Sequence, residues 1–217
     1  MEIARAAAAL FVRQGLRATR AEDIAQAAGV APRTFYRYFA TKEEAVAPLY
    51  AAGAQRWTEA VRTAPAGLGL PDALEHAVRH TLTPGVGVSA ASWEWVRTLI
   101  RPADTSPALR KVRAEVCQTS ERALAEILTW RTPAEPTPAE PTADSQGAGE
   151  RAVGPVAVTP DLRFAAAVAG SAVRVAVKCW AATAAPPSGP QGPAARALRH
   201  LASARDFGWG GERRTTR

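Results

Sequence analysis

The sequence predicts an all-α protein, in which an N-terminal domain of three short helices in a helix-turn-helix arrangement is followed by a larger helical domain. Three observations lead to this class. Apolar residues recur at intervals of three and four along most of the chain, which is the spacing of one face of an α-helix. The alternation of apolar and polar residues that marks a strand is nearly absent. Four helix-start signals fall within the first 46 residues.

The first domain, residues 1–46, begins with two short helices. An apolar face over residues 3–11 predicts a first helix that ends near Gly15. Thr19, followed by Glu22, predicts a capping box at the start of a second helix, which stops at Gly29.

A third helix is predicted to begin at Pro32 and to run to about Phe39, because the missing N–H of proline has no partner at the first helical position anyway. Thr41 and Glu44 predict a capping box for a long fourth helix. Pro48 should kink that helix or delay its regular start.

The second domain is expected over residues 47–210. Helical patterns cover residues 46–61, 71–82, 92–100, 107–129, 161–183 and 194–205. Residues 131–160 repeat a Thr/Pro/Ala/Glu unit without apolar periodicity, which predicts a disordered or extended loop. Residues 211–217 are expected to be a disordered tail. The small residues of the 161–183 helix favour close approach of another helix, as at a subunit interface, and the alternative explanation is an alanine-rich composition.

The third helix of the first domain has two distinct faces. At 100° per residue, Phe35 and Phe39 lie on one side, and Arg33 and Arg37 lie on the other. Three hydroxyl side chains occupy the flanks: Thr34, Tyr36 and Tyr38. Arginine can bond guanine bidentately, threonine can meet a thymine methyl group, and tyrosine can reach phosphates. This arrangement suits a helix that enters the DNA major groove, whereas the alternative from periodicity alone is a bundle with a solvated outer face.

The chain's length and charge agree with a small domain joined to a larger one. Its 217 residues, 47% of them hydrophobic, exclude a disulfide-stapled mini-protein and a fully disordered chain. A formal net charge of +7 favours an anionic partner. Residues 1–45 hold seven Lys and Arg against five Asp and Glu, whereas residues 196–217 hold six Arg against two acids. Net charge is therefore a weaker indication of DNA binding than the third helix.

The first 46 residues also resemble a known family. The matching positions are Phe11, Gly15, Thr19, Asp23-Ile24-Ala25, Ala28-Gly29-Val30, the run Pro32-Arg33-Thr34-Phe35-Tyr36-Arg37-Tyr38-Phe39, and Thr41-Lys42-Glu43. Together they resemble the DNA-binding domain of the TetR family of bacterial transcriptional regulators. The resemblance implies a set of DNA contacts: Thr19, Arg20, Pro32, Arg33, Thr34, Tyr36, Arg37, Tyr38 and Lys42.

Within that set the resemblance assigns different roles. Residues 32–34, 36 and 37 would face bases or nearby phosphates, while Tyr36, Tyr38 and Lys42 would clamp the backbone. Thr19 and Arg20 would touch phosphate. The chain departs from the family at Arg20, where Ser or Thr is usual, and at Ala31, where a capping serine is common, so the third helix is expected to lack a side-chain cap.

The resemblance further implies a repressor that binds a palindromic operator in double-stranded DNA as a homodimer and is released by a small molecule. The two last helices, residues 161–183 and 194–205, would form the dimer interface. A transcriptional activator of the same family and an architectural DNA binder that tolerates any sequence are the alternatives.

Four tryptophans of the second domain are candidates for the ligand pocket: Trp57, Trp93, Trp95 and Trp130. Aromatic side chains often line apolar pockets, so the effector is expected to be apolar or aromatic. The alternative for each, and the commoner position for a tryptophan in a helical bundle, is the core.

Other kinds of function find little support. No G-x-S-x-G, H-E-x-x-H, P-loop or G-x-G-x-x-G motif occurs, so neither an enzyme nor a cofactor is expected. His76 and His80 have a spacing that can hold a metal, but no third ligand is evident. Cys117 and Cys179 are expected to be buried free thiols. The start of the chain does not read as a signal peptide and no apolar run approaches the ~18 residues of a membrane span, so a cytoplasmic protein without a membrane partner is expected.

Overall fold

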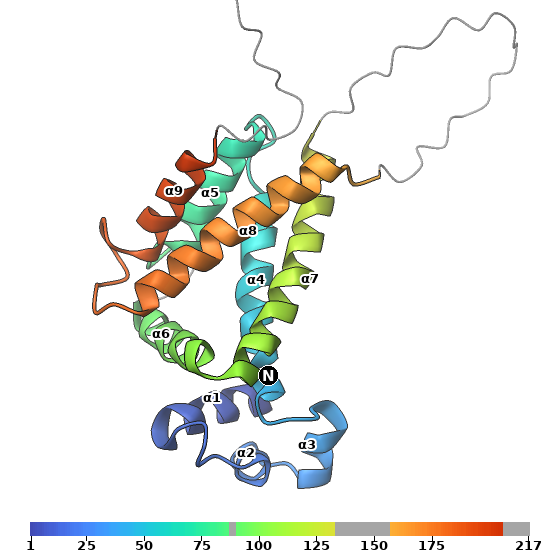
Figure 1. The fold of residues 1–217 in the computed structure, drawn as a ribbon, viewed down its shortest axis with the longest axis vertical. Coiled ribbons are helices and arrows are strands. Elements are labelled where there is room, and N and C mark those ends of the chain that lie inside the picture. The colour runs from blue at the N-terminus through green and yellow to red at the C-terminus, as the bar shows by residue number, and fades with distance from the viewer. Residues whose placement is uncertain (87–89, 133–156, 206–217) are drawn as a thin grey trace, which may run out of the picture.

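The structure is a computed structural model that describes residues 1–86, 90–132 and 157–205. The regular elements in these ranges are all helical, which confirms the all-α class (Figure 1). They are α1 (Glu2–Gln14), α2 (Ala21–Ala27), α3 (Pro32–Tyr38), the 3-10 turn η1 (Glu44–Val46), α4 (Ala47–Arg62), α5 (Leu70–Leu82), α6 (Ala90–Thr105), α7 (Pro107–Arg131), α8 (Pro160–Ala181) and α9 (Pro193–Ser203). The expected tail and most of the expected loop lie outside the described residues.

The boundaries of the first helices follow from their glycines and prolines. Gly15 ends α1 at a φ of 85°, and Gly29 follows α2 at a φ of 67°; both angles are in the left-handed region that favours glycine. Pro32 occupies the first turn of α3, and Ala31 supplies no side-chain cap, as expected. Pro48 lies in the first turn of α4, so the regular helix begins only after η1.

The capping box predicted from Thr19 and Glu22 is wrong. The N-cap of α2 is Arg20, whose backbone N–H donates to Asp23 Oδ2 at 2.9 Å. The Thr19 side chain instead turns inward, is 1% exposed, and donates from Oγ1 to the carbonyl of Gly15 at 2.8 Å. The N-cap of α2 is thus one residue later than predicted, and Thr19 instead stabilises the turn that follows α1.

The second domain consists of α4 to α9 and lies above the first three helices in the view of Figure 1. Helices α4 and α7 pack along each other, α8 packs against α7 and α9, and α9 packs against α5. The buried core of this domain includes Trp57, Leu74, Leu128 and Trp180. Helix α6 continues to Thr105, beyond its predicted end.

The head, defined as residues 1–46, shares its core with the second domain. Phe11, Ile24 and Phe35 are buried in one cluster together with Leu99 of α6 and Leu109 of α7. A shift of α6 or of the start of α7 would therefore act directly on the helices of the head.

Helix α8 is an exception to the expectation that no apolar segment approaches the length of a membrane span. With 22 residues and a mean hydropathy of 1.3, it is long and apolar enough, by length and composition alone, to cross a membrane. It packs against α7 and α9, however, and Ala169, Ala176 and Trp180 are fully buried within the second domain. In this fold α8 is a packed helix of the bundle.

Candidate DNA-binding surface and ligand pocket

Helix α3 has the two faces that its sequence predicts. Phe35 is fully buried, and its ring centroid lies 5.6 Å from that of Phe39. Arg33 and Arg37 are exposed on the outer side. Apolar packing thus fixes one side of the short helix and leaves both guanidinium groups free to approach another molecule.

The other predicted contact residues of α3 lie beside these arginines. Tyr36 and Tyr38 are 52% and 62% exposed, while Thr34 is half-buried. Arg37 donates from Nη2 to the Tyr38 hydroxyl at 3.2 Å, and its guanidinium carbon lies 4.9 Å from the centre of the Tyr38 ring. Stacking of this kind limits the rotamers of Arg37 and so orients it before any partner binds.

Polar contacts join α3 to the start of α2. The Tyr36 hydroxyl donates to Glu22 Oε1 at 3.1 Å, and this bond raises the pKa of Tyr36. A backbone hydrogen bond and the bond from Tyr36 lower the pKa of Glu22. Arg20 Nε lies 3.5 Å from Glu22 Oε2. The structure therefore brings Arg20 to the same surface as α3 and adds Glu22, for which the sequence carries no signal of a DNA contact.

Thr19 and Lys42 have structural partners inside the head. Lys42 Nζ donates to the carbonyl oxygens of Leu16 at 2.7 Å and Thr19 at 2.8 Å, which ties the segment after α3 to the turn between α1 and α2. The Thr19 side chain is buried, so it does not face outward. A phosphate contact by Lys42 stays a prediction.

Replacing Lys42 by methionine should destabilise the head by about 1–3 kcal/mol, because the two carbonyl oxygens lose their charged donor. Chemical denaturation followed by circular dichroism measures the change. Lys111→Met removes the same charge from an exposed position on α7 and should change stability little. Equal stabilities of the two variants would contradict the structural role of Lys42.

A cavity of about 1460 Å³ is lined mostly by residues of the second domain and reaches α1 of the head. Residues of α1, α4, α5, α6, α7 and α8 line it, and Trp57, Trp93 and Trp95 are among them. Trp130 is a correction, since it does not line the cavity and is 84% exposed. It falls in the last turn of α7, on the face turned to solvent.

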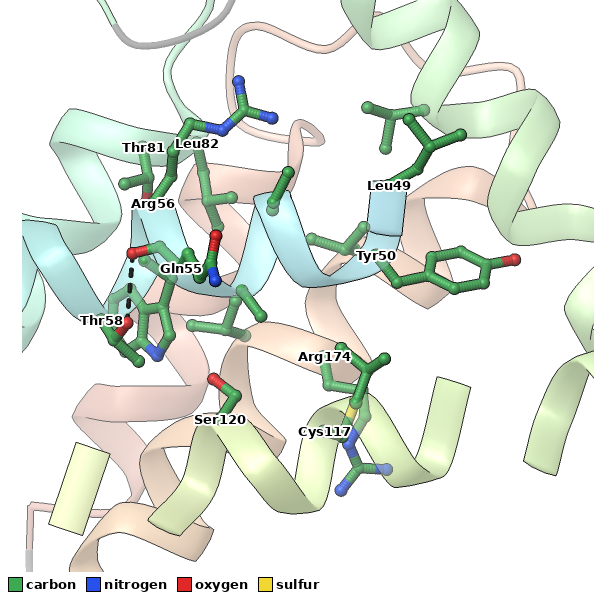
Figure 2. A pocket seen from close by; sticks show the side chains of 18 of the residues that line it. Leu49, Tyr50, Gln55, Arg56, Thr58, Thr81, Leu82, Cys117, Ser120 and Arg174 are labelled. Atoms are coloured by element: carbon green, nitrogen blue, oxygen red, sulfur yellow. Dashed lines mark hydrogen bonds between the residues drawn. The ribbon is translucent and has the colours of Figure 1, made fainter. Parts of the chain in front are cut away.

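Sequence reasoning missed the polar residues of the cavity, because they come from different helices. Figure 2 shows Tyr50 on α4, Cys117 and Ser120 on α7, and Arg174 on α8 around the same space. The Tyr50 hydroxyl donates to the carbonyl of Leu99 at 3.0 Å, and burial raises the pKa of Tyr50 to about 12. Tyr50 is therefore neutral at physiological pH.

The histidines and cysteines form no metal site among the residues that the structure describes. The rings of His76 and His80 stack with centroids 6.4 Å apart, and no cluster of three or more metal-binding side chains occurs in those residues. Cys117 is a half-buried free thiol, and burial raises its pKa. Cys179 is exposed, so the expectation that both thiols are buried is wrong for it.

Comparison with known proteins agrees with the geometry of the head. Residues 3–47 match the family described as "Bacterial regulatory proteins, tetR family". The HTH-type transcriptional regulator TcmR of Streptomyces glaucescens is 38% identical over 81 residues, which are 37% of this chain and 36% of TcmR. The HTH-type transcriptional repressor KstR2 of Mycobacterium tuberculosis is 49% identical over 45 residues, 21% of this chain and 22% of KstR2.

A solved structure extends the similarity of fold to nearly the whole chain. Thermus thermophilus FadR, a TetR family transcriptional repressor in complex with lauroyl-CoA, superposes with a TM-score of 0.55 at 21% identity. The superposition covers 94% of this chain and 93% of that one. TcmR and KstR2, in contrast, are matched over a minority of their length. Residues 3–47 of the chain are therefore an amino-terminal domain of the TetR family of bacterial regulatory proteins.

Proposed function

We propose that the protein is a repressor that binds a palindromic operator as a homodimer and leaves it when a small, largely apolar molecule occupies the cavity. The observation that carries the DNA-binding part is α3, on which Arg33 and Arg37 are exposed opposite the buried Phe35. Insertion of α3 into the major groove would bring both guanidinium groups to guanine edges. Arg20, Pro32, Thr34, Tyr36 and Tyr38 would contact flanking bases and phosphates.

The release mechanism rests on the position of the cavity. Met1 and, on α1, Arg5 and Ala9 line part of it together with residues of the second domain, so an occupant that reaches this part would touch the head itself. A ligand that binds more tightly to the DNA-free arrangement must weaken DNA binding, and operator DNA must weaken ligand binding by the same factor. Thermus thermophilus FadR, which shares this fold, is solved in complex with lauroyl-CoA, and this supports the proposal that this chain also takes a small molecule.

A stripe of exposed and half-buried residues on α8 supports the homodimer. Phe164 and Val175 are 51% and 39% exposed, and Val168 and Ser171 lie between them at spacings that place all four on one helical face. A second copy that packs on this stripe would place two α3 helices for two half-sites, about 34 Å apart.

Replacing Val175 by glutamate should shift the protein from dimer to monomer in sedimentation experiments and weaken operator binding strongly, because one α3 reads only half of the site. Lys111→Glu, on the exposed side of α7, serves as a control for added negative charge and should remain dimeric. A monomeric wild-type protein, or a dimeric Val175→Glu variant with an intact fold, would argue against this interface.

Selection of bound duplexes from a random DNA pool tests the function as a whole. Enrichment of an inverted repeat with half-sites about one helical turn apart is expected. Failure of any sequence to enrich would favour the architectural binder. A reporter gene placed behind the enriched site then separates repression from activation, and reduced expression is the expected result.

A further inference from the structure

The cavity has a cationic end formed by Arg113 of α7 and Arg174 of α8. Both arginines line the cavity, and both lie close enough to act electrostatically on the thiol of Cys117, one turn along α7 from Arg113. Figure 2 shows Arg174 beside Cys117. Two guanidinium groups from different helices therefore converge on the same part of the wall.

Within the described part of the chain, neither arginine of this end forms an ion pair with an acid. Arg113 is half-buried, and no hydrogen bond or ion pair joins its guanidinium group to another residue in the described part of the chain. Arg174 donates from Nη2 to the Ser171 hydroxyl at 2.7 Å, a neutral partner. Arg174 is exposed, whereas the Arg113 cation is half-buried, and holding it without an ion-pair partner is unfavourable. An anion that enters between the two therefore gains charge-assisted bonds.

The acids of the cavity wall leave a positive balance. The wall includes four arginines and two glutamates. Glu59 is bound to Arg62, with Arg62 Nε donating to its Oε2 at 2.8 Å. Glu121 is the acidic group that acts on Cys117, and it packs over Gly170 of α8. One carboxylate thus faces two guanidinium groups at this end.

The two buried tryptophans give the rest of the cavity a different chemistry. Trp57 and Trp93 are 5% and 3% exposed, and each carries a buried indole N–H without a hydrogen-bond partner among the described residues. Indole faces favour an apolar body, and the two unused donors can bind a carbonyl or ether oxygen of a ligand. The volume of about 1460 Å³ exceeds that of most small-molecule pockets, which leaves space for a long molecule.

We propose that the cavity binds an anionic amphiphile, with its carboxylate or phosphate group held between Arg113 and Arg174 and its apolar body against Trp57 and Trp93. The binding itself is independent of the proposed repressor function. Only its effect on DNA rests on that function.

The anionic group would lie next to the link between the two domains. Arg113 acts electrostatically on Tyr50, and Tyr50 packs against both the core of the head and the core of the second domain. Its hydroxyl holds α4 to the carbonyl of Leu99 on α6. Neutralising Arg113 by a bound anion changes the charge beside this contact, which is how occupancy would reach the head.

The binding proposal is tested with three probes of equal chain length: decanoate, decanol and decyltrimethylammonium, each below its micelle concentration. Fluorescence of the protein's six tryptophans reports binding to the free, full-length chain. Decanoate is expected to bind saturably and at least about tenfold more tightly than decanol, and decyltrimethylammonium more weakly than either. Equal affinities for decanoate and decanol, or no binding of decanoate, would overturn the proposal.

Variants locate the anionic site. The double variant Arg113→Gln/Arg174→Gln should lose at least about tenfold in affinity for decanoate and keep the wild-type affinity for decanol, which shows that the cavity is intact. Lys111→Gln removes a charge from the outer face of α7 and should leave both affinities unchanged. Decanoate affinity that is unaffected by the double substitution would contradict the assignment.

The wild-type protein and the arginine variant also distinguish a failure of the ligand proposal from a failure of the proposed repressor function. If decanoate fails to bind while a selected duplex is still recognised, the anionic ligand is wrong and the DNA-binding function stands. If decanoate binds as expected while no duplex is selected, the ligand site stands and the regulator function is wrong. Release of the selected duplex by decanoate, lost in Arg113→Gln/Arg174→Gln, is the result expected when both are right.

Discussion

Replacing Phe35 by alanine should destabilise the head by about 3–5 kcal/mol and abolish DNA binding, because the ring is removed from a fully packed position. Phe35 is fully buried, meets the Tyr36 ring edge-on at a centroid distance of 5.4 Å, and holds the inner side of α3 against the core of the head. A helix of seven residues has little stability of its own, so α3 depends on this packing.

Guanidinium denaturation followed by circular dichroism measures the loss of stability in Phe35→Ala. Tyr38→Ala removes a second ring from α3 at a position that is 62% exposed, and its effect on stability should stay below about 1 kcal/mol. A Phe35→Ala variant as stable as the wild type would mean that α3 is not anchored through this side chain.

Replacing Arg37 by alanine should weaken binding to a selected operator by about 1–3 kcal/mol per half-site while leaving the fold intact. Arg37 is exposed and its contacts to Tyr38 lie on the surface, so its removal opens no cavity in the core. If Arg37 contacts a base, the loss of affinity is largest for the selected operator, and the variant discriminates less between the four bases at one position of the site.

Fluorescence anisotropy with a labelled duplex measures the loss for Arg37→Ala. Arg122→Ala removes an exposed arginine from α7 of the second domain, outside the proposed dimer stripe, and should bind the operator like the wild type. An equal fall in affinity for operator and unrelated DNA would show that Arg37 contacts phosphate rather than a base. An unchanged affinity would exclude it from the interface.

The ends of the helices can be predicted from the sequence where a single residue determines the local backbone conformation. Gly15 and Gly29 adopt positive φ, and Pro32 and Pro48 occupy first turns, so their effects need no tertiary information. The capping of α2 was mispredicted because Thr19 and the true N-cap Arg20 are adjacent, and burial of the threonine decides between them.

The cavity is less predictable, because side chains from six helices converge on it. Trp57, Trp93 and Trp130 are the same residue type, so the sequence gives each of them the same likelihood of lining a pocket. Only the position of Trp130 in the exposed last turn of α7 excludes it from the cavity. Arg113 and Arg174 are far apart in the sequence on α7 and α8, so nothing local indicates that they meet near Cys117. Packing of α8 on α7 brings them together.

The proposed function depends on recognition of a particular DNA sequence by α3. Competition at fixed salt between a selected duplex and a shuffled duplex of the same length and composition tests it most directly. We expect the selected duplex to bind at least about 10³-fold more tightly, and we expect the Arg33→Ala/Arg37→Ala protein to lose most of that ratio. Equal affinity of the wild-type protein for the two duplexes would contradict sequence-specific recognition by α3.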